Sequence, residues 1–204
     1  MRVELSMILL LSLLWAQPKE EDMVQFNERW RVVHMNPKEV DIHLLGREKH
    51  LRSVDKVWLW SEQQKSEPLV VMNGGMYHRN HRPVGLFIDA DGEWESLNND
   101  SGKGNFFMKP NGVFGIDHNG MPFIVDAQEE LPKSIRMATQ SGPLLLNRGM
   151  VHPVFQPQST HQKIRNGVGI TRDGMIVFAI SLTPVRLYDF ARFFLELGCE
   201  QALY

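Results

Sequence analysis

Three glycine-containing turns, each set between two short apolar runs, constrain the fold of this chain most strongly. They are Asp91-Gly92, Asn119-Gly120 and Asp173-Gly174. Asp-Gly and Asn-Gly dipeptides favour the tight turns that join neighbouring antiparallel strands, because glycine adopts a positive φ without steric cost. The flanking runs are rich in valine, isoleucine and phenylalanine, which are enriched in strands. The sequence therefore predicts three β-hairpins and a largely antiparallel sheet.

Helical and further strand segments complete the pattern. In Leu187–Leu197 apolar residues recur at intervals of three and four, which predicts a helix packed on the sheet and ended by Gly198. Similar spacing predicts a sheet-packed helix over Leu51–Gln63, and Ala127–Ser134 is expected to form one or two helical turns. Four more strands are predicted, namely Trp30–Met35, Val40–Leu45, Leu69–Met72 and Gln201–Tyr204. The expected class is α+β, with a mixed, largely antiparallel sheet, β-hairpins and packed helices.

Composition narrows the functions that this chain can have. It has 204 residues, of which 43% are hydrophobic and 23% charged, and a formal net charge of −2. Without a basic excess, nucleic acid is not an expected partner. The single Cys199 excludes an intramolecular disulfide and is expected to pack as a small hydrophobe. No carboxylate follows His78 and His81 at a metal-binding spacing, so neither a metal nor a cofactor is expected.

The N-terminus has a separate pattern. An apolar run from Leu5 to Trp15 precedes Ala16-Gln17-Pro18, and it is shorter than the roughly 20 residues that span a bilayer. A secretory signal peptide over residues 1–16 is the preferred interpretation, and a buried N-terminal helix is the alternative. The expected organisation continues with a linker over 17–30 and one domain over 31–204. Export to the periplasm or the extracellular space follows, without a stable membrane span.

The polar loop Asn73–Gly85 is the first candidate for ligand binding. Gly74 and Gly75 free its backbone, and His78 supplies a hydrogen-bond donor, as do Arg79, His81 and Arg82. The loop follows a predicted strand, and ligands of α/β sheets often bind at the carboxyl ends of strands. A solvated surface loop is the alternative.

Two further glycine-bearing bends could line the same site. ATQSGPLLL offers Ser141 and the backbone of Gly142, without the G-x-S-x-G pattern of a serine nucleophile. KIRNGVGITRDG offers Arg165, whose planar guanidinium can bind phosphate through two hydrogen bonds. These bends favour an anionic, hydroxyl-rich ligand, against the alternatives of ordinary turns and a salt bridge from Arg165 to a strand carboxylate. No pair of acids of the kind that glycoside hydrolysis uses stands out, so the catalytic residue is unknown.

Taken together and in order, six segments resemble the bacterial branch of the phosphodiester glycosidase family, which includes the uncovering enzyme that removes N-acetylglucosamine from its phosphodiester link to mannose. They are NGGMY, PVGLFI, GNFFMKPNGVFGI, ATQSGPLLL, STHQKIRNGVGIT and FARFFLELGCEQALY. The resemblance runs from Arg31 to the last residue and implies an exported hydrolase of sugar-1-phosphodiesters. The family's motif positions fall on Asn73, Gly74 and Gly75, on Ser141 and Gly142, and on Arg165, Asn166 and Gly167.

The end of the sequence departs from this family pattern. Family members continue from A-L-Y into a strand and an L-D-G motif, whereas this sequence ends at Tyr204. The last strand is therefore expected to be incomplete, and the aspartate of that motif, a candidate acid, is missing. Two hypotheses stand: a hydrolase acting on a small-molecule or glycan phosphodiester, and a non-catalytic glycan- or envelope-binding module or truncated, inactive relative. The oligomeric state is not predicted.

Overall fold

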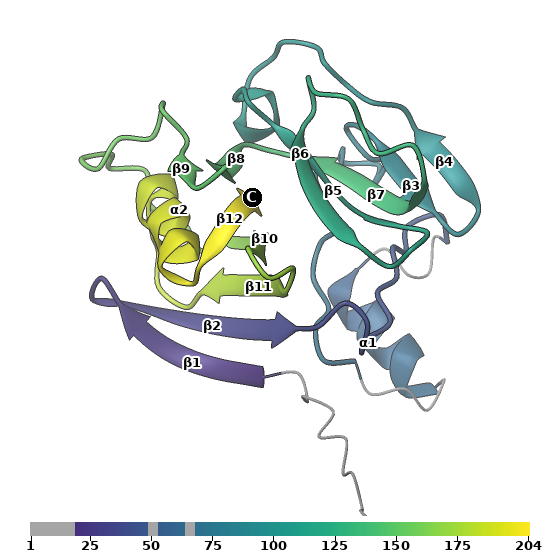
Figure 1. Ribbon diagram of the computed structural model, residues 1–204, viewed down its shortest axis with the longest axis horizontal. Helices are drawn as coiled ribbons and strands as arrows, with labels where there is room; N and C mark the ends of the chain where they lie inside the picture. Colours follow the sequence, from purple (N-terminus) through teal and green to yellow (C-terminus); the bar gives the residue numbers. More distant parts are fainter. Residues whose placement is uncertain (1–18, 49–52, 64–67) are drawn as a thin grey trace, which may run out of the picture.

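Two antiparallel sheets and two α-helices make up a sheet-rich α+β fold (Figure 1). The structure, a computed structural model, describes residues 19–48, 53–63 and 68–204. The predicted signal peptide over 1–16 lies outside these residues. Within them, every pairing between neighbouring strands is antiparallel, which confirms the largely antiparallel part of the prediction, whereas the strands form two sheets and neither is mixed.

The larger sheet has seven strands in the order β1-β2-β11-β10-β12-β8-β9. Their bounds are β1 Lys19–Gln25, β2 Glu28–Met35, β8 Leu144–Asn147, β9 Met150–Val151, β10 Asn166–Thr171, β11 Ile176–Ser181 and β12 Cys199–Leu203. The strand predicted near the last residues is β12, and it lies inside the sheet between β10 and β8. Its incompleteness stays a prediction.

The smaller sheet has five strands in the order β4-β3-β7-β5-β6. They are β3 Phe87–Asp89, β4 Gly92–Glu95, β5 Gly112–Asp117, β6 Pro122–Asp126 and β7 Ile135–Ser141. A short 3-10 helix, η2 (Asn105–Phe107), precedes β5. All three predicted hairpins are present, as β3–β4, β5–β6 and β10–β11. Gly92, Gly120 and Gly174 have φ angles of 97°, 79° and 83°, so each turn uses the freedom that only glycine has at low cost.

Helix α2 (Leu187–Glu196) covers one face of the larger sheet, as its periodicity predicted (Figure 1). Phe190, Phe193 and Phe194 are fully buried, and the ring of Phe193 stacks on Trp30 of β2 with centroids 4.1 Å apart. Truncating a phenylalanine in such a core costs about 3–5 kcal/mol. Gly198, at φ 78°, follows the helix and lets the chain turn directly into β12.

A second core lies between the two sheets. It combines Met35 and Ile176 of the larger sheet with Phe114, Ile124 and other apolar residues of the smaller one. The chain passes from one sheet to the other directly, because only Gly142 and Pro143 separate β7 from β8. The end of β7 and the start of β10 are thereby held close to this core. Two of the predicted site segments lie at these strand ends.

Several predicted elements differ from the observed ones. In place of the expected linker over 17–30, β1 pairs along its whole length with β2. Val40–Leu45 is not a strand, although Val40, Ile42 and Leu44 pack against the core between the sheets. The alternation of apolar and polar residues arises because every second side chain packs against the core, although this segment pairs with no strand. Leu69–Met72, predicted as a strand, is irregular, and Ala127–Ser134 contains turns and no helix.

Helix α1 (Val54–Gln63) confirms the helical prediction but not the predicted packing. Val54, Trp58 and Leu59 are exposed, and Ser61 is the one buried residue of the helix. Leu51, at the start of the predicted helix, lies outside the described residues. No helix within residues 19–48, 53–63 and 68–204 is long and apolar enough to cross a membrane.

Candidate functional site

A hydrogen bond between two asparagines joins the first and third predicted site segments. The Asn166 side-chain amide, at the start of β10, donates to the Asn73 side-chain oxygen over 2.7 Å. Asn73 also donates from its own amide to the Gly75 carbonyl over 3.3 Å. Two segments far apart in sequence are thereby fixed side by side, with unused amide donors and acceptors that could contact hydroxyl groups.

The glycine pair of the same loop packs directly against β7. The Thr139 hydroxyl donates to the Gly74 carbonyl over 2.8 Å. A Cβ at Gly75 would lie 2.3 Å from the Thr139 hydroxyl oxygen and 2.8 Å from the Gln140 carbonyl oxygen, and Gly75 has a φ of 86°. Glycine is therefore required at this position by both space and backbone conformation, which makes Gly75 a packing residue in this structure.

The second predicted segment reaches β12 rather than open solvent. The Ser141 hydroxyl donates to the Tyr204 carbonyl over 2.5 Å, and Ser141 is buried. At Gly142 a Cβ would come within 2.7 Å of the Asn111 Cβ, and at Gly167 within 2.7 Å of the Leu203 carbonyl oxygen. These three residues hold β7, β10 and β12 close together. In this structure the Ser141 hydroxyl and the absence of a side chain at Gly142 and Gly167 allow the strands to pack closely.

Arg165 is the unusual residue of the group. It stands directly before β10 and is only 5% exposed. Its Nε donates to the Val185 carbonyl over 2.9 Å, Nη2 donates to the His161 carbonyl over 3.3 Å, and the guanidinium carbon lies 5.3 Å from the centre of the Tyr204 ring. The predicted alternative of a salt bridge is wrong, because no Asp or Glu in the described part of the chain pairs with Arg165.

A buried cation without an acid partner is electrostatically costly, because desolvation of a charge costs several kcal/mol. Burial accordingly lowers the pKa of Arg165 from its ordinary value, and Tyr204 beside it opposes that shift. The backbone carbonyls and the aromatic ring compensate the charge only in part. A bound anion would complete the compensation of this charge.

Arg165 lines a cavity of about 230 Å³, which we call the Arg165 cavity. At about 30 Å³ per water molecule this holds seven or eight waters, which is room for a phosphate or another small polar group. The other lining residues form a polar set and an apolar set: Asn105, Gln156, Ser159 and His161, and Met108, Val154, Phe155, Leu187 and Tyr188.

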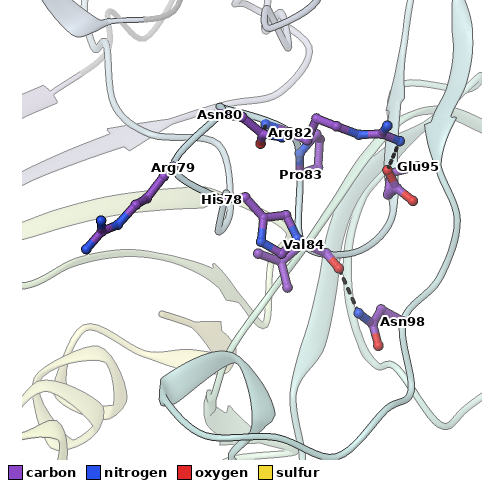
Figure 2. A pocket seen from close by; sticks show the side chains of 8 residues that line it. All are labelled: His78, Arg79, Asn80, Arg82, Pro83, Val84, Glu95 and Asn98. Atoms are coloured by element: carbon purple, nitrogen blue, oxygen red, sulfur yellow. Dashed lines mark hydrogen bonds and ion pairs between the residues drawn. The ribbon is translucent and has the colours of Figure 1, made fainter.

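His78 lines a different, wider depression of about 740 Å³, which we call the His78 cleft. Its other lining residues are Arg79, Asn80, Arg82, Pro83, Val84, Glu95 and Asn98. Figure 2 shows Arg82 turned toward Glu95, with a hydrogen bond of 2.8 Å, and Arg79 extending in the opposite direction. Of the predicted site residues, Arg165 lines one cavity and His78 lines the other, and the remaining ones line neither.

Catalytic acids remain unassigned. Glu95 is the single carboxylate among the residues that line the two cavities, and it is paired with Arg82. No group of three or more His, Cys, Asp or Glu side chains in the described part of the chain could hold a metal ion. The site as described offers a cation, amides and hydroxyls, which bind and orient a ligand.

Two contributors were not singled out as site residues from the sequence. Tyr204 lies over Arg165 and accepts from Ser141, and no motif marks it, because its proximity arises only from the pairing of β10 with β12. Gln140 is 1% exposed, and its side chain bonds Leu86 and Asn98, next to the His78 cleft. The available signal was a glutamine shortly before the apolar run Leu144–Leu146, since buried amides are normally fully hydrogen-bonded.

Comparison with known proteins identifies the family of this chain. The pattern of the phosphodiester glycosidase family matches residues 66–204, so the chain belongs to this family. It is 39% identical over 136 residues to the uncharacterized protein YigE of Escherichia coli (strain K12), a match that covers 66% of this chain and 54% of that protein. The chain thus spans about half the length of this curated relative.

Two solved structures share the fold. One is the catalytic domain of zebrafish N-acetylglucosamine-1-phosphodiester alpha-N-acetylglucosaminidase, auto-inhibited by its pro-peptide, with a TM-score of 0.59, 15% identity, and coverage of 91% of this chain and 68% of that one. The other is a hypothetical protein from Synechocystis, with a TM-score of 0.55, 13% identity, and coverage of 91% and 55%. At these identities the likeness concerns the fold.

Proposed function

We propose that this chain is a hydrolase that cleaves sugar-1-phosphodiester bonds. One observation carries the proposal: Arg165 is a buried cation without an acid partner in the described residues, and it lines a cavity large enough for a phosphate. Membership of the phosphodiester glycosidase family supports the same chemistry. Arg165 binds the phosphate of the diester, and the amides of Asn73 and Asn166 contact sugar hydroxyls at the neighbouring edge.

In this reaction water adds to the anomeric carbon of the sugar while the bond from that carbon to the phosphate oxygen breaks. The phosphate monoester leaves with the electron pair, and the proton released from water passes to the medium or to the leaving phosphate. A phosphate monoester is a good leaving group, so the reaction depends less on a general acid, whose usual effect is ~10²–10⁴-fold. A fixed cation beside the phosphate stabilises the negative charge that develops on it.

A non-catalytic glycan-phosphate-binding module is the second candidate. It is favoured by the lining of the two cavities, where Glu95 is the single carboxylate and is already paired. Retaining and inverting glycosidases generally use two carboxyl groups about 5–9.5 Å apart across the scissile bond. This candidate predicts binding through Arg165 without turnover.

Product analysis separates these candidates and identifies the bond that breaks. The purified protein is incubated with UDP-N-acetylglucosamine in ¹⁸O-labelled water. Glycosidic cleavage gives free N-acetylglucosamine with the label on its anomeric oxygen, together with unlabelled UDP. Attack of water at the β-phosphorus would instead put the label on UDP, and hydrolysis of the anhydride would give N-acetylglucosamine-1-phosphate and UMP; either result would overturn the proposal. Binding without any product would favour the non-catalytic module.

We also propose that the protein acts after export, which rests on the apolar run from Leu5 to Trp15. Fractionation of cells that express the full chain tests this part separately. Export predicts a shortened chain outside the cytoplasm, and full-length protein confined to the cytoplasm would contradict it.

A further inference from the structure

The tip of the Asn73–Gly85 loop concentrates positive charge. His78-Arg79-Asn80-His81-Arg82 contains two arginines and two histidines and no acid, in a chain whose formal net charge is −2. Four of these five residues, all but His81, line the His78 cleft, together with a single acidic residue, Glu95. Because Glu95 pairs with Arg82 over 2.8 Å, the charge of Arg79 is left without a carboxylate partner in the described part of the chain.

Backbone hydrogen bonds hold the main chain of the loop in a fixed arrangement. The His78 N–H donates to the Arg82 carbonyl, the His81 N–H to the His78 carbonyl, and the Val84 N–H to the Met76 carbonyl, all between 2.8 and 2.9 Å. The ring of His81 stacks on Tyr77 with centroids 5.9 Å apart. A loop closed by its own backbone hydrogen bonds presents Arg79 and His78 with little further loss of conformational entropy on binding.

The floor of the cleft is equally well supported. The Asn98 side-chain amide donates to the Val84 carbonyl over 2.8 Å, and the Leu86 and Asn98 N–H groups both donate to the side-chain oxygen of buried Gln140. The cleft therefore lies between a closed loop and a braced strand. A depression with walls of this kind, lined by an excess of one charge, concentrates ligands of the opposite charge.

The same loop is anchored to the strand that follows Arg165. Its first residue, Asn73, is bonded to Asn166 at the start of β10, and its tip lines the cleft. We propose that the His78 cleft is a second anion subsite, which binds a phosphate group carried by the aglycone of the sugar-1-phosphodiester. This inference rests on the proposed function for the identity of the ligand.

Binding of inorganic pyrophosphate, measured by calorimetry, tests the subsite without any need for turnover. The measurement is made in the Arg165→Met background, so that the Arg165 cavity does not contribute. Changing Arg79 to Gln is expected to weaken binding about threefold to tenfold, the range for a partly exposed charge-assisted contact. Changing Glu95 to Gln removes the one acid of the cleft and is expected to tighten binding by a similar factor.

The opposite signs of these two changes distinguish the subsite from general damage to the fold. Arg172→Gln is the matched control, because Arg172 is exposed, pairs with Glu200 and lines neither cavity. Pyrophosphate binding that is absent from the Arg165→Met protein, or that is equal in the Arg79 and Glu95 variants, would overturn the subsite.

A kinetic comparison relates the subsite to the proposed reaction. Two substrates are used that differ only in a phosphate group on the aglycone. The phosphorylated substrate is expected to have the lower KM, and Arg79→Gln is expected to reduce the ratio of the two KM values. If neither substrate is cleaved, the proposed function fails while the binding measurement still tests the cleft. If both substrates are cleaved with equal KM values, the proposed subsite is contradicted and the proposed function is retained.

Discussion

The side-chain amide of Asn166 donates to the side-chain oxygen of Asn73 over 2.7 Å, which joins a loop and a strand that are 93 residues apart in sequence. This bond fixes the base of the loop beside Arg165. Neither asparagine lines the Arg165 cavity or the His78 cleft, so the bond acts by holding the loop against β10.

The Asn73–Asn166 bond should appear as a coupling energy. Asn73→Ala and Asn166→Ala are each expected to lower the free energy of unfolding by about 0.5–1.5 kcal/mol, as for a typical hydrogen bond. The double variant should cost less than the sum by about 0.5–1 kcal/mol, because both changes remove the same interaction. Urea denaturation of the four proteins measures this. Strict additivity would show that the bond does not hold the loop in solution.

Glycine at position 75 should be far less replaceable than glycine at position 174. Both residues have a positive φ, which costs an alanine about 1–2 kcal/mol. A Cβ at Gly174 would meet no atom within 4 Å, whereas at Gly75 it would lie 2.3 Å from Thr139. We expect Gly75→Ala to cost about 1–3 kcal/mol more than Gly174→Ala, the range for overpacking. Equal urea midpoints for the two variants would contradict this packing.

His152 should make the protein less stable as the pH falls. It is 4% exposed, and burial lowers its pKa, with the Lys109 carbonyl and Asp126 opposing the shift. The unfolded chain takes up this proton near pH 6.5 and the folded chain only at lower pH. The unfolded state therefore binds more protons below about pH 6.5, and the free energy of unfolding decreases as the pH is lowered.

Replacement by glutamine tests this directly. His152→Gln should flatten the decrease in stability between pH 7 and 5, measured by urea denaturation at each pH. Burial also lowers the pKa of His34, so His34→Gln should flatten the profile in the same direction. A profile that keeps its full slope in the His152 variant would contradict a buried, neutral His152.

Phosphate should stabilise the protein through Arg165. At a concentration ten times Kd, a ligand that binds only the folded state adds about 1.4 kcal/mol to the free energy of unfolding. The Arg165→Met protein should keep its fold, because the Val185 carbonyl also accepts from the Lys163 N–H, and it should lose the part of this stabilisation that Arg165 provides. Thermal unfolding with and without phosphate measures it, with Arg172→Met as control. An equal phosphate effect on the wild type and the Arg165 variant would place the anion elsewhere.

The hairpins and α2 could be predicted from the sequence because their signals are local. Gly92, Gly120 and Gly174 mark turns that few other residues can make, and the apolar spacing of α2 is unbroken. Strand β1 could not be predicted, since its exposed sequence KEEDMVQ carries no apolar alternation. Its turn to β2 uses positive φ angles at Phe26 and Asn27, where no glycine marks it.

The site was predictable as a set of segments and not as a set of contacts. Asn73, Ser141 and Arg165 each bond a residue far away in sequence, namely Asn166, Tyr204 and Val185, and these partners are set by the tertiary fold. Tyr204 reaches Arg165 only because β12 inserts beside β10. Likewise, no local pattern shows that a buried arginine has carbonyl oxygens rather than a carboxylate as its neighbours.

The central claim is that Arg165 binds the phosphate of a sugar-1-phosphodiester that this chain hydrolyses. Steady-state kinetics with UDP-N-acetylglucosamine test it most directly, comparing the wild type with Arg165→Lys and Arg165→Met. We predict release of N-acetylglucosamine by the wild type and a decrease in kcat/KM of about 10²–10³-fold for Arg165→Met, the range for removal of one preorganised electrostatic group. Arg165→Lys keeps the charge and loses the planar fork of hydrogen-bond donors, so its kcat/KM should lie between those of the wild type and Arg165→Met. No product from the folded wild type, or equal kcat/KM for the wild type and Arg165→Met, would contradict the claim.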